Sequence, residues 1–189
     1  MPLRTFLAVE LELPTVAALV KAQEQLASFG DKVKWVERVN LHITLNFLGD
    51  VADEDAVEVC RRAAQAAGRV EPFEFGVTGL VCSPTHGALR MVWANVDDPS
   101  GMMSVLHDEL AKGFAQMGLR QENREFRPHI TVARIKYVAN QARFRGAVRM
   151  FSDVDFGRQH CEEVVAFTSL LTDEGPVYTA LSHAELGTK

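Results

Sequence analysis

The sequence predicts an α+β fold in two pseudo-symmetric lobes, each an antiparallel sheet with helices packed on its outer face. Three observations favour this fold. Apolar runs with strand character alternate with amphipathic helical segments along the 189 residues. The tripeptide His-Ile-Thr occurs twice, at residues 42–44 and 129–131, and each copy lies in a predicted strand that follows a predicted helix. We therefore expect one copy in each lobe and a cleft between the lobes.

The first half of the chain has five segments with strand or helix character. In chain order, they are a strand at 4–11, a helix from Pro14 to about Gly30, an extended segment at 33–36, the first motif strand at 41–48 and a helix that ends at Gly68. Gly49 and Asp50 are expected to close the motif strand, because both residue types favour turns. Asp53 is the expected N-cap of the helix that follows.

The second half repeats the order of helix and motif strand and adds further strands. In chain order, it has strands at 73–81 and 89–96, a helix from 98 to about 114, the second motif strand at 127–135, a segment of undecided type at 140–150, and strands at 154–156, 163–171 and 177–183. Residues 98–100 begin the helix and residues 173–176 form the last turn. The loop at 80–89 would influence substrate choice if it borders the cleft.

The composition is that of a globular protein with a sizeable core. Hydrophobic residues make up 47% of the chain and charged residues 24%, so we expect a single domain over residues 1–189. No apolar run approaches the roughly 18 residues of a membrane helix, and the N-terminal segment has the character of a strand rather than of a signal peptide. The scattered Cys60, Cys82 and Cys161 favour reduced thiols in a cytoplasmic protein over disulfides or a metal knuckle.

Charge is distributed unevenly along the chain. The net charge of −5 argues against a long nucleic-acid track. Residues 118–150, which surround the second His-Ile-Thr, hold eight basic and two acidic residues, so this segment carries +6 and the remainder −11. A positive field at a motif on an acidic body indicates a small or terminal anionic substrate, whereas the plainer interpretation is a solvated, arginine-rich loop.

The two motifs carry the chemistry that this sequence predicts. Residues i and i+2 of a strand share a face, so His42 lies beside Thr44, and His129 lies beside Thr131. If the two strands are neighbours, two imidazoles and two hydroxyls converge, which suits acid–base attack on a phosphate ester. Arg134 would add a charge-assisted contact, although strict alternation places it on the opposite face from His129 unless the strand ends or twists there.

The motif histidines have two other interpretations. A histidine in one His-x-Thr strand is usually a partly buried residue with a hydrogen bond, so it is the pairing of two copies that carries the hypothesis. A zinc site needs three or four ligands at defined spacings, and the sequence has no His-x-His, no His-Glu-x-x-His and no close cysteine pair. We therefore expect neither a metal nor an organic cofactor. The remaining histidines lack a threonine two residues on and are expected to be structural or exposed: His86, His107, His160 and His183.

Around both motifs, the sequence resembles the 2H phosphoesterases, and within them the RNA 2′,3′-cyclic phosphodiesterases, also called the 2′-5′ RNA ligase family. The similarity covers nearly the whole chain. It lies in the opening strand at Arg4–Ala8, the first motif with its surroundings at 33–36 and 40–49, the second motif at Phe126–Arg134, and a closing hairpin formed by 169–171 and 175–178.

The resemblance implies a role for each motif residue. His42 would donate a proton to the leaving oxygen, His129 would activate water, and Thr44 and Thr131 would hold the phosphate. The product would be a 2′-phosphomonoester, and the reverse reaction would join ends in a 2′-5′ linkage. Arg134 and Phe47 match motif positions as substrate-binding residues. For Phe47 a place in the core is the stronger interpretation, given how often phenylalanine is buried.

The sequence leaves several functions open. The leading hypothesis is metal-independent hydrolysis of 2′,3′-cyclic phosphate ends of RNA or oligonucleotides, with cyclic nucleotides as further ligands. One alternative is a 2H phosphoesterase for another cyclic or 2′-5′-linked nucleotide. Another is a non-catalytic RNA-end binding protein, which intact histidines and threonines at both motifs disfavour. We expect no membrane association and no obligate protein partner, and therefore a monomer.

Overall fold

The computed structural model describes residues 3–119, 125–173 and 175–188. It has four α-helices and nine strands in these ranges. The strands are β1 (Leu3–Glu10), β2 (Lys32–Trp35), β3 (His42–Val51), β4 (Phe73–Ser83), β5 (Met91–Asp97), β6 (His129–Tyr137), β7 (Asp155–Cys161), β8 (Glu163–Leu171) and β9 (Pro176–Glu185). The helices are α1 (Leu13–Leu26), α2 (Ala56–Ala67), α3 (Met102–Ala115) and α4 (Gln141–Arg149).

The described strands form one curled antiparallel sheet made of two lobes. Their order is β7-β4-β5-β6-β3-β1-β8-β9, with β2 paired to β6 outside this path. The two motif strands, β3 and β6, are thus central neighbours, and each has three further strands beyond it. The predicted α+β fold with two pseudo-symmetric lobes is confirmed, and the two sheets expected from the sequence are joined into one at β3 and β6.

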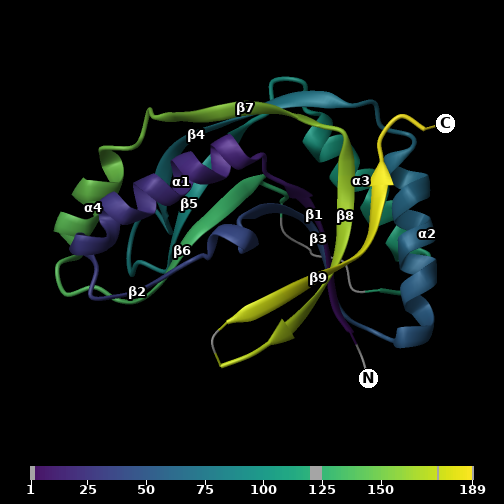
Figure 1. Cartoon of the computed structure of the whole chain (residues 1–189), viewed down its shortest axis with the longest axis horizontal. Coiled ribbons are helices and arrows are strands. Elements are labelled where there is room, and N and C mark those ends of the chain that lie inside the picture. Colours follow the sequence, from purple (N-terminus) through teal and green to yellow (C-terminus); the bar gives the residue numbers. More distant parts are fainter. Residues whose placement is uncertain (1–2, 120–124, 174, 189) are drawn as a thin grey trace.

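The helices pack in pairs on the outer faces of the lobes. α1 and α4 lie over β7 and β4, whereas α2 and α3 contact each other and cover β8, β9 and β3. Figure 1 shows these pairs at opposite ends of the molecule. α1 follows β1 but packs on the other lobe, and α3 follows β5 and crosses in the opposite direction. This exchange of helices ties the two lobes together.

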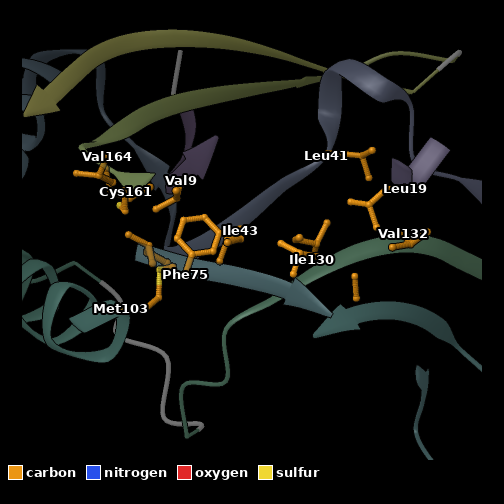
Figure 2. Packing of buried hydrophobic residues seen from close by; sticks show 14 of the residues in the cluster. Val9, Leu19, Leu41, Ile43, Phe75, Met103, Ile130, Val132, Cys161 and Val164 are labelled. Atoms are coloured by element: carbon orange, nitrogen blue, oxygen red, sulfur yellow. The ribbon is translucent and has the colours of Figure 1, made fainter. Parts of the chain in front are cut away.

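The lobes meet at a single backbone pair, Ile43 opposite Ile130. Past this point β3 leaves β6, and β2 takes its place along the same edge, with Trp35 opposite Ala133 and Lys34 opposite Arg134. Both isoleucines are fully buried in a core that also contains Phe75 from β4 (Figure 2). Burying two such side chains contributes roughly 3–6 kcal/mol, and this stabilisation fixes the register of the junction.

Several predicted element boundaries differ from the structure. β3 continues to Val51, because Gly49 adopts a positive φ of 74° within a register shift instead of ending the strand. Asp53 begins a short 3₁₀ turn, and the N-cap of α2 is Asp55. β7 extends well beyond residue 156 because its polar residues pair with β4 at an edge of the sheet.

The segment of undecided type is a helix, α4. Its N-cap is Asn140, whose side chain accepts a hydrogen bond from the Arg143 backbone N–H at 2.9 Å. Residues 98–100 do not begin α3 as expected: the helix starts at Met102, because its N-cap Gly101 has a left-handed φ of +71°. The Asp98 carboxylate nevertheless accepts a hydrogen bond from the Met103 N–H at 2.7 Å. In the predicted turn at 173–176, Glu174 lies outside the described residues.

Candidate active site

A cleft of about 490 Å³ lies where the lobes meet. Its lining comes from strands of both lobes and from the β8–β9 hairpin. The lining residues are Arg4, Phe6, Lys34, Trp35, Val36, Glu37, Asn40, His42, Thr44, Phe47, His129, Thr131, Arg134, Ser169, Leu171, Pro176 and Tyr178. All six site residues predicted from the sequence are among them.

The pairing of β3 with β6 brings the motif side chains together. Because the strands are antiparallel and Ile43 faces Ile130, His42 comes beside Thr131, and Thr44 comes beside His129. The isoleucines point into the core, so these four side chains point the other way, into the cleft. Each lobe thus supplies one imidazole and one hydroxyl to a shared site, as the sequence predicts.

His42 is held by four groups. Its Nδ1 lies 2.8 Å from the Asn40 carbonyl oxygen, which only accepts hydrogen bonds, so Nδ1 carries a proton and Nε2 is the nitrogen that can exchange one in the cleft. Nε2 lies 3.0 Å from Thr44 Oγ1. The ring stacks on Phe6 at 5.1 Å and meets the edge of Tyr178 at 5.4 Å.

Burial lowers the pKa of His42 below its usual value of 6.5. The Asn40 carbonyl opposes this shift, while the positive charges of Arg134 and His129 add to it. In the free site, the neutral imidazole is therefore the favoured form of His42.

His129 is held in a matching way. Its Nδ1 lies 2.7 Å from the carbonyl oxygen of Arg127, two residues upstream. The Asn40 carbonyl is likewise two residues before His42. This contact leaves Nε2 as the nitrogen that can exchange a proton in the cleft. The imidazole stacks on the indole of Trp93 with a centroid distance of 4.0 Å and an interplanar angle of 27°.

A bulge in each motif strand places the fifth residue after each histidine in the cleft. The register skips Val132 between Thr131 and Ala133 on β6, and it skips Leu45 between Thr44 and Asn46 on β3. In both strands the two residues after the threonine are buried, which resets the alternation. This shift brings Arg134 onto the face of His129, whereas strict alternation along the strand would have placed it on the opposite face.

The same shift exposes Phe47 in the other lobe. Its side chain is 37% exposed and lines the cleft, so the expectation that it belongs to the core is wrong. The guanidinium carbon of Arg4 lies 5.1 Å from the centroid of the Phe47 ring. The fifth residue after the motif histidine is thus Arg134 in one lobe. In the other lobe it is Phe47, whose ring carries the guanidinium of Arg4.

Several lining residues were not predicted as site residues. Arg4 and Lys34 bring positive charge from β1 and β2, and Tyr178 from β9 has its pKa raised by burial, against the opposing charges of Arg134 and Arg4. Asn40 donates a side-chain hydrogen bond to the Pro176 carbonyl at 3.1 Å, so it connects the first motif to the β8–β9 hairpin. The similarity of residues 4–8, 40–49 and 175–178 to the family was the available signal for these positions.

The basic segment supplies less of the site than expected. Of its described arginines and lysine, Arg134 alone lines the cleft. Arg127 pairs with Glu125 at 2.8 Å, and Arg145 donates to the carbonyls of Thr85 and Gly87 at 2.8 and 2.7 Å. Arg120, Glu122 and Arg124 lie outside the described residues. Arg145 thus fastens the loop at 80–89 to α4, and none of that loop is among the residues that line the cleft.

One cluster among the described residues has the geometry to hold a cation. The ligand atoms of Glu10, Glu163 and His183 lie within 4.8 Å of one another, and His183 Nδ1 is 3.0 Å from a Glu163 carboxylate oxygen. None of the three lines the cleft. In the described part of the chain, no helix is long and apolar enough to cross a membrane.

Comparisons with known proteins agree with this geometry. The family model of the 2′-5′ RNA ligase superfamily matches residues 13–157. An RNA 2′,3′-cyclic phosphodiesterase of Aeropyrum pernix is 34% identical over 166 residues, which cover 88% of this chain and 93% of the relative. The protein of the same name from Methanothermobacter thermautotrophicus is 34% identical over 179 residues, covering 95% of this chain and 96% of its own.

Solved structures have the same fold. TT0787 of Thermus thermophilus superposes with a TM-score of 0.83 at 29% identity, over 97% of this chain and 98% of its own. Escherichia coli LigT in complex with 3′-AMP gives a TM-score of 0.78 at 23% identity, over 98% and 99% of the two chains.

Proposed function

Because this chain belongs to the 2′-5′ RNA ligase superfamily, we propose that it hydrolyses the 2′,3′-cyclic phosphate ends of RNA to 2′-phosphomonoesters, with His42 and His129 as its acid–base pair. The observation that carries this proposal is the junction at Ile43 and Ile130, which gathers two imidazoles and two hydroxyls in one cleft. Curated relatives that match most of the chain are named for this activity. We further propose that residues 1–189 work as one domain.

The reaction divides between the two histidines as follows. His129 Nε2 takes a proton from water while the water oxygen forms a bond to phosphorus. The bond between phosphorus and the ribose 3′ oxygen breaks, and His42 Nε2 delivers a proton to that oxygen. Thr44 and Thr131 donate hydrogen bonds to the non-bridging phosphate oxygens, where negative charge accumulates. The carbonyls that hold both Nδ1 atoms support this scheme, because each leaves an Nε2 in the cleft.

His42 acquires its proton together with the substrate. Burial favours its neutral form in the free site, whereas an anionic phosphate beside it favours the imidazolium. Arg134, which contributes to the low pKa of His42, lies in the same cleft and is expected to pair with the anion instead. Substrate binding thus shifts the balance toward the protonated acid that the leaving oxygen requires.

The proposed reaction needs no metal ion. His42, His129 and Glu37 line the cleft and are of the types that bind zinc, which takes about three protein ligands. Among the described residues, however, the three ligand atoms found within 4.8 Å of one another belong to Glu10, Glu163 and His183, outside the cleft. The cations of Arg4, Lys34 and Arg134 supply the positive charge that a metal would otherwise bring. With a 5′-hydroxyl in place of water as the nucleophile, the same attack on phosphorus breaks the bond to the 3′ oxygen and joins two ends through a 2′-5′ linkage.

Two other functions make different predictions. A phosphoesterase for another cyclic or 2′-5′-linked nucleotide would use the same histidines and leave the RNA end intact. A non-catalytic RNA-end binding protein would show no turnover, although mere binding does not require two imidazoles with their Nδ1 atoms fixed.

The test is hydrolysis of a short RNA that ends in a 2′,3′-cyclic phosphate, in excess EDTA, with the 2′- and 3′-phosphate products resolved. We expect the wild type to yield the 2′-phosphate, and His42→Gln and His129→Gln each to lose activity by at least about a hundredfold. His160→Gln is the matched control, because this exposed histidine on β7 is outside the cleft. Absence of turnover by the wild type, or its loss in EDTA, would contradict the proposal.

A further inference from the structure

The two histidines differ most in the aromatic rings beneath them. Across from the motif threonine on the neighbouring strand, the first lobe has Ala8 opposite Thr44, and the second has Trp93 opposite Thr131. His129 stacks directly on Trp93 at 4.0 Å, whereas His42 reaches the more distant Phe6 at 5.1 Å. Among the differences between the two motifs, Trp93 is the one in direct contact with the ring of His129.

The stack is the contact through which Trp93 acts on the site. Trp93 is not among the residues that line the cleft, and its place opposite Thr131 on β5 puts it beside His129 on the same face of the sheet. Its Nε1 is buried and has no hydrogen-bond acceptor among the described residues. What Trp93 offers the site is the face of its indole ring.

An indole face beneath an imidazole has two consequences. It limits rotation of the ring, which the Nδ1 contact to the Arg127 carbonyl holds at only one atom. It also attracts a cation more strongly than other aromatic rings do, so it interacts favourably with the positive charge that the imidazole gains in the reaction. Both effects suit a base that must face the phosphate and become positively charged as it takes a proton from water.

Other charges act on His129 as well. From β3, His42 faces it across the junction, and on its own strand Arg134 shares the cleft. The same cleft is lined by Arg4 from β1, Lys34 from β2, Glu37 just after β2, and Tyr178 from β9. At the start of its strand, the Arg127 side chain is already paired with Glu125. The indole is the group in direct ring contact with His129.

We propose that Trp93 is a positioning residue for His129: its indole aims the imidazole at the phosphate and stabilises the positive charge that forms there during the reaction. The inference rests on the proposed function, since it assigns Trp93 to the base of that reaction. Trp93 would thus act on the chemical step, and binding of the substrate would depend on it little.

Kinetics with the cyclic-phosphate RNA test the chemical part. We expect Trp93→Leu to lower kcat by about tenfold with KM changed less than about twofold, and Trp93→Phe to keep kcat within about threefold of the wild type. Phe75→Leu is the matched control, a fully buried aromatic of the same lobe whose ring neighbour is Phe73. A wild-type kcat in Trp93→Leu, or an equal loss in Phe75→Leu, would overturn the proposal.

Fluorescence tests the stack without any turnover. The chain has two tryptophans, so Trp35→Phe leaves Trp93 as its only indole. Since a protonated imidazole quenches a stacked indole, we expect emission of this variant to rise with pH. Added His129→Gln should abolish that rise, and added His42→Gln should preserve it.

The two arms separate the two proposals. A rise that survives His129→Gln would show that Trp93 does not report on His129, which overturns the inference even where the enzyme is active. If the wild type fails to open the cyclic phosphate, the proposed function fails. The titration still decides whether the indole senses the His129 proton, and it uses the native Trp93, so it stands even if Trp93→Leu does not fold.

Discussion

Ile43 and Ile130 form the one backbone pair that joins the two motif strands, and both side chains are fully buried on the face opposite the cleft. A slip of one residue at this pair would turn the motif histidines and threonines into the core. The packing of two isoleucines therefore determines where the imidazoles point, and the site depends on the core directly beneath it.

Arg134 is expected to bind the substrate rather than to take part in proton transfer. Arg134→Met should raise KM by about tenfold to a hundredfold with a smaller change in kcat, because a charge-assisted hydrogen bond to the phosphate is lost. Steady-state kinetics with the cyclic-phosphate RNA measure this. Lys136→Met, on the same strand but outside the cleft lining, is the control and should leave KM unchanged. Equal effects of the two substitutions would contradict the assignment.

Arg4 and Phe47 are expected to act as one unit. The Phe47 ring supports the Arg4 guanidinium at 5.1 Å, so Arg4→Met and Phe47→Ala should each raise KM several-fold. The KM of the double variant should be only slightly higher than that of the single variant with the higher KM, because the first change already removes the interaction between the two side chains. A double-mutant cycle on KM gives the coupling. Strictly additive effects would show that the two residues act separately.

Asn40 is expected to hold the β8–β9 hairpin against the first motif. Asn40→Ala removes the hydrogen bond to the Pro176 carbonyl, which should cost about 1–3 kcal/mol of unfolding free energy and speed hydrogen exchange at residues 176–179. Asn140→Ala, which removes the cap of α4 in the other lobe, is the matched control for lost stability. Faster exchange at 176–179 in Asn140→Ala alone would count against this role of Asn40.

Gly79 is expected to tolerate no side chain. Its φ is +66°, and an added Cβ would collide with the Ser152 carbonyl oxygen. Gly49 has a similar φ of +74° but open space around it, so Gly49→Ala carries only the backbone penalty, about 1–2 kcal/mol. Denaturant unfolding should show a larger loss of stability for Gly79→Ala. Equal losses in the two variants would contradict the steric argument.

The burial of His42 predicts how stability depends on pH. Because its pKa is lowered in the folded state, the unfolded chain binds a proton at His42 more readily than the native chain does. Stability attributable to His42 is therefore fully present above its usual pKa and declines as the pH falls below that value. The free energy of unfolding of the wild type, relative to His42→Gln, should decrease from about pH 7.5 to about pH 5. An increase would contradict the sign of the shift.

The fold and the motif face were predictable from local pattern. Within the two His-Ile-Thr segments the strands alternate regularly, and an i, i+2 spacing is enough to place His42 with Thr44 and His129 with Thr131. The gathering of both pairs in one cleft required only that the two strands be neighbours, which the pseudo-symmetric order of elements favoured.

The rest depended on pairing that local pattern does not encode. Arg134 and Phe47 enter the cleft because of bulges, which exist only relative to the partner strands β5 and β1. Arg4 and Tyr178 arrive from opposite ends of the chain. The basic segment at 118–150 was expected to give the site its positive charge. Most of its described arginines instead form ion pairs or loop contacts, or lie on the surface. The stack of Trp93 on His129 is a cross-strand contact, so no local pattern around Trp93 could predict it.

The measurement that tests the central claim most directly is the pH profile of kcat/KM for the cyclic-phosphate RNA. An acid–base pair predicts a bell-shaped profile, in which His42→Gln and His129→Gln each remove one limb, and a different one. The same limb lost from both variants, or a profile that stays bell-shaped in either, would show that the two histidines do not divide the proton transfers between them.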